Sequence, residues 1–443
     1  MSSGTIILVL ALLLGLQPVT TDLYLPALPS ITSGFGAPMS QAQLTLSALV
    51  LAFGFSQMIW GPLSDRYGRR PILLIGMTAY VLASVGSAFS LTMEQLIGWR
   101  IVQGLAMGAG VVIARSIVRD LFDHLEGARV MSKGLTGLGI FACLSAPVGG
   151  VLTEFLGWRA ALLALAIFGA VGLVTVVWRL EETLAHRNPQ AINPKVMIRN
   201  WATITRNKNF WAFALLTTMS YGGLFTFLAS SSFVYIEVLG ISQTQYGLIM
   251  LSSSLAYIAG TFVCRWLLKR ISLRKTIKLG GYISLTAGSA QGLLVLGGVE
   301  SIAALIIPWW FYMVGHGIHQ PCGQSGAVAP FPQMAGAASA LSGLIMMIVA
   351  FGMGLWLGIS LASVAGESRT ALPMTNGIWF WSLLLAAVAL VPLQLLLGVL
   401  TLRLQLAVPA VTIAHQLLAA LLIALLGALG GRCLPAMASR ATA

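Results

Sequence analysis

The sequence predicts an all-α protein that crosses a membrane many times. Of its 443 residues, 58% are hydrophobic and 8% are charged, and the mean hydropathy is +0.90. Hydrophobic runs of about 20 residues, long enough to cross a hydrocarbon core of roughly 30 Å, recur from one end to the other. These runs lack the short polar and apolar alternation of a transmembrane β-barrel.

Twelve spans are expected, and the longest polar interval, 181–209, divides them six and six. Their approximate limits are 5–25, 44–62, 72–90, 96–117, 131–153, 159–179, 210–236, 245–266, 277–297, 301–322, 336–361 and 376–400. The predicted domains are a first six-helix bundle, a central cytoplasmic loop, a second six-helix bundle and a tail, over 1–180, 181–209, 210–404 and 405–443. The hydrophobic tail is either a thirteenth span, an interfacial helix or a hairpin.

The net charge of +13 follows from where the basic residues lie. No basic face interleaved with aromatic residues indicates nucleic-acid binding. With the N-terminus inside, the inner connections carry most arginines and lysines, whereas the outer ones carry glutamates such as Glu94, Glu154 and Glu300. Basic residues favour the cytoplasmic side of a membrane, so a cytoplasmic N-terminus is predicted. The first span lacks the basic start and cleavage site of a signal peptide.

The stretch "GPLSDRYGRRP", 61–71, concentrates charge between two apolar runs. It contains Asp65, Arg66, Arg69 and Arg70 within six residues, flanked by Gly61 and Gly68. Glycine permits close backbone approach or positive φ in so tight a loop. The arginines are expected to bridge to an acid on a neighbouring loop, with Asp120 as the best partner, which would hold helix ends together. The alternative is a basic anchor for the inner side of the membrane.

Two charges fall inside predicted spans. Asp22 lies about seven residues from Pro29, and Arg100 about six from Glu94, so both sit roughly 10 Å deep at 1.5 Å per residue. Intramembrane charges are costly and usually functional. We therefore expect Asp22 and Arg100 to meet inside the bundle, as a pair that exchanges a proton or as a static ion pair.

The loop at 61–71 resembles the signature between spans 2 and 3 of the major facilitator superfamily. In that family the loop is associated with a latch, which would make Asp65 and the loop arginines gating residues. Arg100, Gln103 and Gly104 resemble the R-x-x-Q-G pattern that the family uses for proton coupling. "TDLYLPALP" at 21–29 and "RSIVRD" at 115–120 are similar to the Bcr/CflA drug-resistance branch. The resemblance covers roughly 20–400.

The fifth span contains Gly139 and the run Pro147-Val148-Gly149-Gly150. This run resembles the P-x-x-G-G ending of the family's antiporter signature, although it is one residue short. The alternative is that the small residues only allow close helix packing.

Aromatic and imidazole side chains in the spans are candidates for a substrate cavity: Tyr24, Tyr221, Phe225, His316 and His319. Core or polar packing is the alternative for each. The four cysteines show no CxxC spacing and are expected to be small core residues, without a metal site.

The resemblance implies a secondary transporter of the bacterial inner membrane that exports small amphipathic drugs, such as phenicol- or bicyclomycin-like antibiotics, in exchange for protons by alternating access. An amino-acid or other metabolite exporter is the alternative, and composition alone also allows a channel. The sequence contains no HExxH or GxSxG motif that would indicate an enzyme. It also contains no G-x-x-x-x-G-K-[ST] motif that would indicate an ATP-driven pump. The expected partners are substrate, protons and lipid; the chain is expected to be a monomer that needs no cofactor beyond the proton gradient.

Overall fold

The computed structural model describes residues 3–299, 301–364 and 378, and all regular structure in this part is helical. The first half contains α1 (Ser3–Asp22), η1 (Leu25–Ala27), α2 (Leu28–Phe35), α3 (Met39–Tyr67), α4 (Arg69–Ala88), α5 (Met93–Leu121), α6 (His124–Leu156) and α7 (Trp158–Arg179). The second contains α8 (Pro194–Thr205), α9 (Lys208–Ser232), η2 (Phe233–Val238), α10 (Gln243–Leu268), α11 (Leu273–Leu296), α12 (Ile302–Val328), η3 (Pro332–Met334) and α13 (Ala335–Val364).

The predicted all-helical membrane class is confirmed. Within the described residues, ten helical segments are long and apolar enough to cross a membrane. The span predicted at 277–297 is also a helix, α11, although it is not among those ten. The twelfth predicted span, 376–400, and the tail at 405–443 lie outside the described residues, apart from Ile378.

Two differences from the predicted spans matter for the site. The first helix ends at Asp22, and the chain continues through η1 and α2 to Phe35, so Asp22 lies in the interior of one long apolar segment. The polar interval 181–209 contains a helix, α8, which Asn193 caps by accepting a hydrogen bond from the Lys195 N–H at 3.1 Å. A side-chain cap of this kind satisfies a backbone donor that the first turn leaves free.

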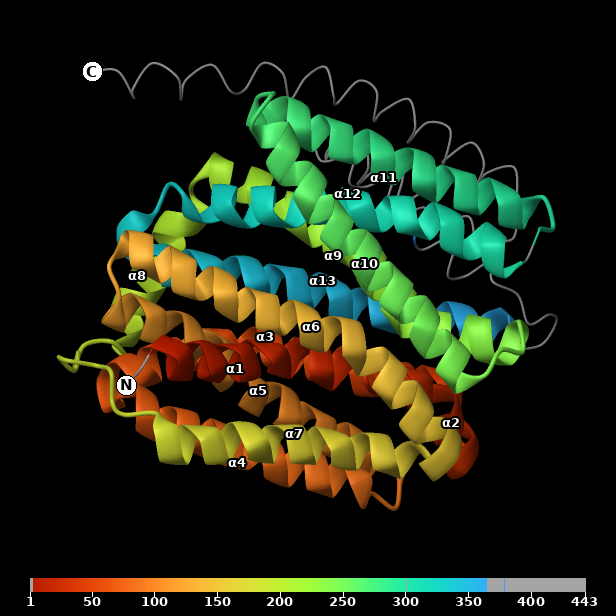
Figure 1. Cartoon of the computed structure of the whole chain (residues 1–443), viewed down its shortest axis with the longest axis horizontal. Coiled ribbons are helices and arrows are strands. Elements are labelled where there is room, and N and C mark those ends of the chain that lie inside the picture. The colour runs from red at the N-terminus through yellow and green to blue at the C-terminus, as the bar shows by residue number, and fades with distance from the viewer. Residues whose placement is uncertain (1–2, 300, 365–377, 379–443) are drawn as a thin grey trace.

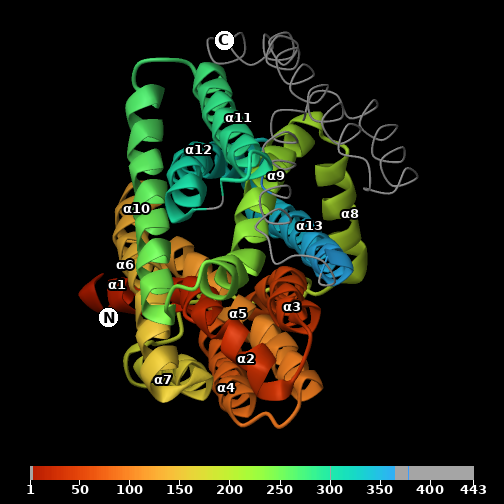
Figure 2. The ribbon, with the colours of Figure 1, turned by 90° about the vertical axis from the view of Figure 1, so that its right-hand side faces the viewer.

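The helices pack as two groups that meet along two helix pairs. Within the first group α3 packs on α5, α1 on α6, and α4 on both α5 and α7; within the second, α12 packs on α9, α10 and α11. The groups meet where α13 packs along α3 and where α10 packs along α6. Figure 1 shows the first group mainly below the second, and in Figure 2 α13 runs beside α3. A site between the groups is therefore built from both halves of the chain.

The bundle has two ends, the Asp65 end and the Glu154 end. The Asp65 end holds the junction of α3 and α4 and the C-terminus of α5, and lies towards α8 in Figure 1. The Glu154 end holds the C-terminus of α6 and the N-terminus of α10, and lies towards α2.

Candidate functional site

The Arg69 side chain joins three helices at the Asp65 end. Gly68, with φ of +112°, allows the chain to turn directly from α3 into α4, which places Arg69 at the first position of α4. The Arg69 side chain is 2% exposed and ion-pairs with Asp65 of α3. Its Nε donates to Asp120 Oδ2 of α5 at 2.7 Å, so the predicted contact with Asp120 is present.

The other two loop arginines lie elsewhere. The Arg66 guanidinium lies 5.3 Å from the centre of the Tyr67 ring, and Arg70 donates to the Val177 carbonyl at 3.0 Å. Arg69 is therefore the one arginine of the 61–71 loop with an ion pair among the described residues, so the expected bridge to Asp120 is formed by Arg69 alone. Asp65 also lies 4.0 Å from Arg119, whose side chain is 62% exposed.

Glu182 is a partner of this loop that the sequence analysis missed. Its carboxylate accepts hydrogen bonds from the backbone N–H groups of Arg69 at 2.9 Å and Arg70 at 3.2 Å. These N–H groups begin α4, where the helix dipole favours a negative charge. The Asn188 N–H, in the same polar interval, donates to the Asp65 carbonyl at 2.9 Å. The distance along the chain hid both contacts from sequence reasoning.

The predicted ion pair between Asp22 and Arg100 is wrong. In the part of the chain that the structure describes, no ion pair joins them within 4 Å. Arg100 is fully buried and donates to Gln103 Oε1 at 2.6 Å and to the Thr20 carbonyl at 3.2 Å. Depth along a helix does not fix its rotation, so two groups at one level can still face different neighbours.

Neutral groups of the first bundle surround Arg100. Its guanidinium lies 4.1 Å from the centre of the Tyr24 ring, and the Tyr24 hydroxyl is 2.6 Å from the Thr45 hydroxyl. Gln103 extends the network by donating to Ser84 at 2.6 Å. The spacing of Arg100 and Gln103 thus places them in one hydrogen-bonded network inside the bundle.

Asp22 faces the second bundle instead. Its carboxylate accepts a hydrogen bond from Thr21 at 2.8 Å and is half-buried. It lies within electrostatic range of Cys143 of α6, Tyr221 of α9 and Tyr246 of α10. The carboxylate therefore stands where the two bundles meet, with no basic side chain within 4 Å among the described residues.

The glycines of the antiporter-like run permit close backbone contact at the Glu154 end. A side chain at Gly149 would meet the Leu23 carbonyl, and one at Gly150 would meet the Gln243 carbonyl. On α10, a Cβ at Gly247 would lie 2.7 Å from the Ala146 carbonyl oxygen and 2.8 Å from Pro147 Cα. Gly139 faces open space.

A hydrogen bond completes this contact, since Glu154 accepts from the Thr244 N–H at 2.9 Å. A second bond between the bundles, from Gln43 Nε2 to the Ala229 carbonyl at 3.2 Å, joins α3 to α9. The Glu154 end is therefore closed by direct contact between the two bundles.

The five predicted cavity residues pack inside the protein and line neither of the two cavities described below. Tyr24 lies against Arg100, and Tyr221 and Phe225 belong to the hydrophobic core. His316 Nδ1 lies 2.8 Å from the Ser220 hydroxyl, and His319 Nε2 lies 3.3 Å from the Ile277 carbonyl. The two imidazoles thus bond α12 to α9 and α11.

Two cavities lie between the bundles on the Asp65 side. The larger, about 550 Å³, extends to Asp65 and Arg119 and is also lined by α8 and residues 333–340. The smaller, about 80 Å³, lies between α1, α3 and α5 of one bundle and α9, α12 and α13 of the other. Gln57, Arg115 and Ser339 line both cavities. These residues therefore stand where the cavities adjoin.

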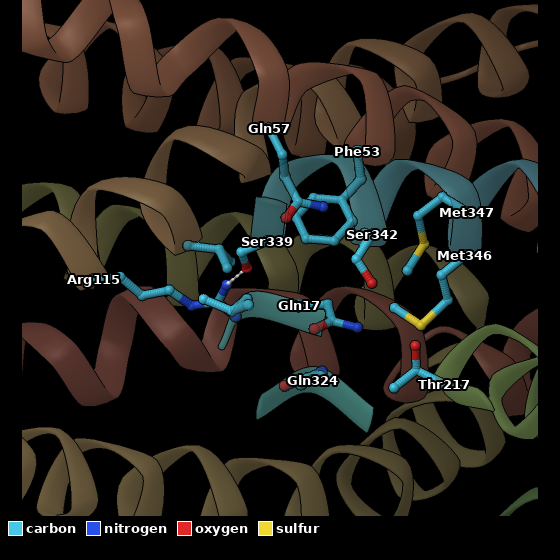
Figure 3. Close-up of a pocket in the computed structure, with 13 residues that line it drawn as sticks. Gln17, Phe53, Gln57, Arg115, Thr217, Gln324, Ser339, Ser342, Met346 and Met347 are labelled. Atoms are coloured by element: carbon cyan, nitrogen blue, oxygen red, sulfur yellow. Dashed lines mark hydrogen bonds between the residues drawn. The ribbon is translucent and has the colours of Figure 1, made fainter. Parts of the chain in front are cut away.

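Polar side chains project into the smaller cavity from several helices, as Figure 3 shows for Gln17, Gln57, Arg115 and Gln324. Phe53, Met346 and Met347 supply its apolar lining. A mixed lining of this kind suits an amphipathic small molecule. The sequence signal that could have found these residues is the presence of amide and guanidinium groups inside apolar spans.

The described residues contain no group of three or more His, Cys, Asp or Glu that could hold a metal ion. The two buried cysteines of α10 and α12, Cys264 and Cys322, lie with their sulfurs 3.6 Å apart as free thiols.

The fold and this cavity together define a polytopic membrane carrier. Residues 10–353 match the family model described as Major Facilitator Superfamily, and the chain belongs to that family. The resemblance predicted from the loop at 61–71 is therefore confirmed.

Curated relatives carry drug-resistance names. The chain is 28% identical over 385 residues to the bicyclomycin resistance protein homolog of Haemophilus influenzae, covering 85% of this chain and 93% of the relative. It is 27% identical to multidrug resistance protein D of Escherichia coli, with 84% and 92% covered, and 26% identical to a chloramphenicol resistance protein of Pseudomonas aeruginosa, with 72% and 75% covered. These relatives confirm the predicted resemblance to the Bcr/CflA branch.

Solved structures share the fold. A partially occluded inward-open conformation of the xylose transporter XylE from E. coli matches with a TM-score of 0.69 at 14% identity, covering 89% of this chain and 99% of that one. A D-xylose–proton symporter matches with a TM-score of 0.65 at 14% identity, covering 86% and 96%. The protein is thus a multi-pass transporter of the major facilitator fold.

Proposed function

We propose that this protein exports small amphipathic compounds, including phenicol- or bicyclomycin-like antibiotics, in exchange for protons. The observation that carries the proposal is the cavity between the bundles, which is lined from both halves and extends to the Asp65 end, while glycine contacts close the Glu154 end. A carrier works by alternating access when its two halves rock about such a site. The names of the relatives support drugs as the cargo.

The bias of basic residues supports a cytoplasmic position for the Asp65 end, and the bacterial relatives support the inner membrane as the location. The cavity would then receive substrate from the cytoplasm or inner leaflet, and separation of α6 from α10 would release it outside. Both halves of the site come from one chain, which supports a monomer. The proton gradient is the proposed energy source, with no cofactor.

Asp22 is the proposed proton carrier, because it is an intramembrane carboxylate at the bundle interface with no basic partner within 4 Å in the described residues. The carboxylate would exchange protons with alternating sides as the bundles move. Arg100 would act indirectly, since it donates to the Thr20 carbonyl two residues away and so positions the end of α1.

An amino-acid exporter is less well supported. A zwitterion needs an acceptor for its ammonium group as well as a cation for its carboxylate. The described residues that line the smaller cavity include Arg115 but no Asp or Glu. The lining therefore favours compounds without a positive charge.

The test is a drug-susceptibility panel on efflux-deficient bacteria that express the chain, followed by transport in proteoliposomes. We expect raised resistance to chloramphenicol or bicyclomycin, lost on addition of a proton uncoupler. Proteoliposomes with an imposed pH gradient should transport the same drug. The pH of their lumen should change faster when the drug is present, because protons are exchanged for it. Drug flux that ignores the pH gradient and the uncoupler would contradict proton exchange and indicate a uniporter or channel.

A further inference from the structure

Arg115 is a cation in the middle of the candidate transport path. It lies on α5, lines both cavities and is exposed to them. Its one hydrogen bond among the described residues runs from Nη1 to Ser339 Oγ on α13 at 3.3 Å, drawn as a dashed line in Figure 3. This single long bond to a neutral hydroxyl leaves most of the five guanidinium donors without a partner among the described residues.

Arg115 has no counter-ion in the part of the chain that the structure describes. Within the described residues, no carboxylate lies within 4 Å of Arg115. Asp65, which lines the larger cavity together with Arg115, is engaged with Arg69, and so is Asp120. Arg115 projects from a membrane-spanning helix into both cavities without a carboxylate partner among the described residues, and a charge in that position indicates a site for an anionic ligand.

The surroundings of Arg115 add donors and an apolar surface. The amides of Gln17, Gln57 and Gln324 and the hydroxyls of Thr217 and Ser342 line the smaller cavity. Phe53, Met346 and Met347 lie on the same lining. An acidic head group bound to Arg115 would therefore have an aromatic ring and flexible thioethers beside it for an apolar body.

We propose that Arg115 is an anion-recognition residue and that the preferred cargo includes small amphipathic organic anions, such as aromatic carboxylates and sulfonates. This inference rests on the proposed function, which makes the cavity a transport site, and names the substrate class of that site. The proposal also implies selection against cationic amphipaths. Arg115 lines both cavities, Arg119 lines the larger one, and the described lining of the smaller cavity has no carboxylate.

Two naphthylamine dyes of nearly equal shape test the proposal. 1-Anilinonaphthalene-8-sulfonate is an anion, and N-phenyl-1-naphthylamine is the same ring system without the sulfonate. Binding is measured by fluorescence on the purified chain in nanodiscs of phosphatidylcholine, which keeps anionic lipid head groups out of the cavity. Empty nanodiscs give the background.

The expected result is a saturable site for the anionic dye that Arg115→Gln weakens by about 30-fold, as for removal of one partner of a buried charge pair. The neutral dye should bind the variant within about twofold of the original, because its ring contacts remain. Arg115→Lys should recover part of the anion affinity. Arg159→Gln is the control, since this variant removes the same charge at a site outside both cavities. Arg159 contacts the Trp158 ring and donates to the Ser90 carbonyl.

Unchanged anion affinity in Arg115→Gln overturns the proposal. An equal loss of affinity for both dyes also overturns the proposal. Such a result would mean that Arg115 links α5 to α13 and does not recognise the charge of the ligand. The binding assay needs no proton gradient. Arg115-dependent binding of the anion without any proton-driven export would leave the anion site standing and overturn the proposed function.

Discussion

The Arg100 guanidinium lies over the Tyr24 ring, 4.1 Å from its centre, inside the first bundle. The positive charge thus faces the negative face of an aromatic ring and two neutral oxygen acceptors, of Gln103 and Thr20. Asp22, five residues from Gln17 and two from Tyr24 along the chain, faces the other bundle. Arg100 therefore links groups within the first bundle, whereas the Asp22 carboxylate lies where the two bundles meet.

Replacing Tyr24 should separate the contribution of its ring from that of its hydroxyl. Tyr24→Phe keeps the ring over Arg100 and loses the bond to Thr45, at a cost of about 1 kcal/mol. Tyr24→Leu removes the ring as well, and loss of a desolvated cation–π contact costs about 2 kcal/mol more. The measurement is thermal unfolding of the purified protein in detergent.

Tyr282→Leu is the control for this series, because Tyr282 is 47% exposed on α11 and its loss should leave the melting temperature nearly unchanged. Equal melting temperatures for Tyr24→Phe and Tyr24→Leu would show that the ring does not stabilise Arg100.

Asp22→Asn should abolish pH-gradient-driven drug flux while the protein stays folded in the membrane. Asparagine keeps the shape and can still accept the bond from Thr21, but it cannot carry a proton. Transport is measured in proteoliposomes at several imposed gradients, with Glu94→Gln as the control because Glu94 is exposed at the start of α5. Flux in Asp22→Asn that still rises with the gradient rules out Asp22 as the carrier.

The same variant tests the separation of the two charges. If Asp22 and Arg100 formed a pair, the double variant Asp22→Asn with Arg100→Gln would restore stability that either single change had lost. The structure predicts no such rescue, so the two losses of melting temperature should add. A coupling energy above about 1 kcal/mol between the two sites would contradict their separate surroundings.

The sequence predicted the fold class and the Arg69 cluster, but not the cavity. Apolar runs reveal spans because a bilayer imposes their length, and a short charged loop limits which acids its arginines can reach. The rotation of each helix is set by packing that the pattern does not contain, which is why Arg100 meets Tyr24 and not Asp22. Polar residues in the spans have two different roles, which the sequence pattern does not distinguish. Gln103 forms hydrogen bonds inside the first bundle, whereas Gln17 lines the smaller cavity.

The carboxylates around Arg69 should differ in importance. The Asp120 side chain is 13% exposed and that of Asp65 is 39% exposed, so water can replace Asp65 more readily. We therefore expect Asp120→Asn to lower the melting temperature more than Asp65→Asn. Both should slow transport turnover with little change in drug affinity, because Arg69 links α3, α4 and α5 outside the smaller cavity.

Arg66→Gln tests which loop arginine matters. Arg66 lies over Tyr67 and has no ion pair among the described residues, so its replacement should change turnover less than either carboxylate variant. The measurement is drug flux and drug binding on the same preparations. A larger effect from Arg66 than from Asp120 would refute the assignment of the cluster to Arg69.

The contact between α6 and α10 should decide how firmly the Glu154 end closes. Gly247→Ala would place a Cβ 2.7 Å from the Ala146 carbonyl oxygen, so the helices must separate by several tenths of an ångström. This separation would weaken the hydrogen bond between Glu154 and Thr244.

Gly281→Ala on α11 is the matched control, because its Cβ would face open space and alanine favours a helix by roughly 0.5–1 kcal/mol over glycine. Spin labels on Phe155→Cys and Leu248→Cys, exposed on α6 and α10, report the separation in a background without native cysteines. We expect Gly247→Ala to shift the label distances towards longer values and Gly281→Ala to leave them unchanged; identical distributions in the two variants would mean that this glycine contact does not hold the end closed.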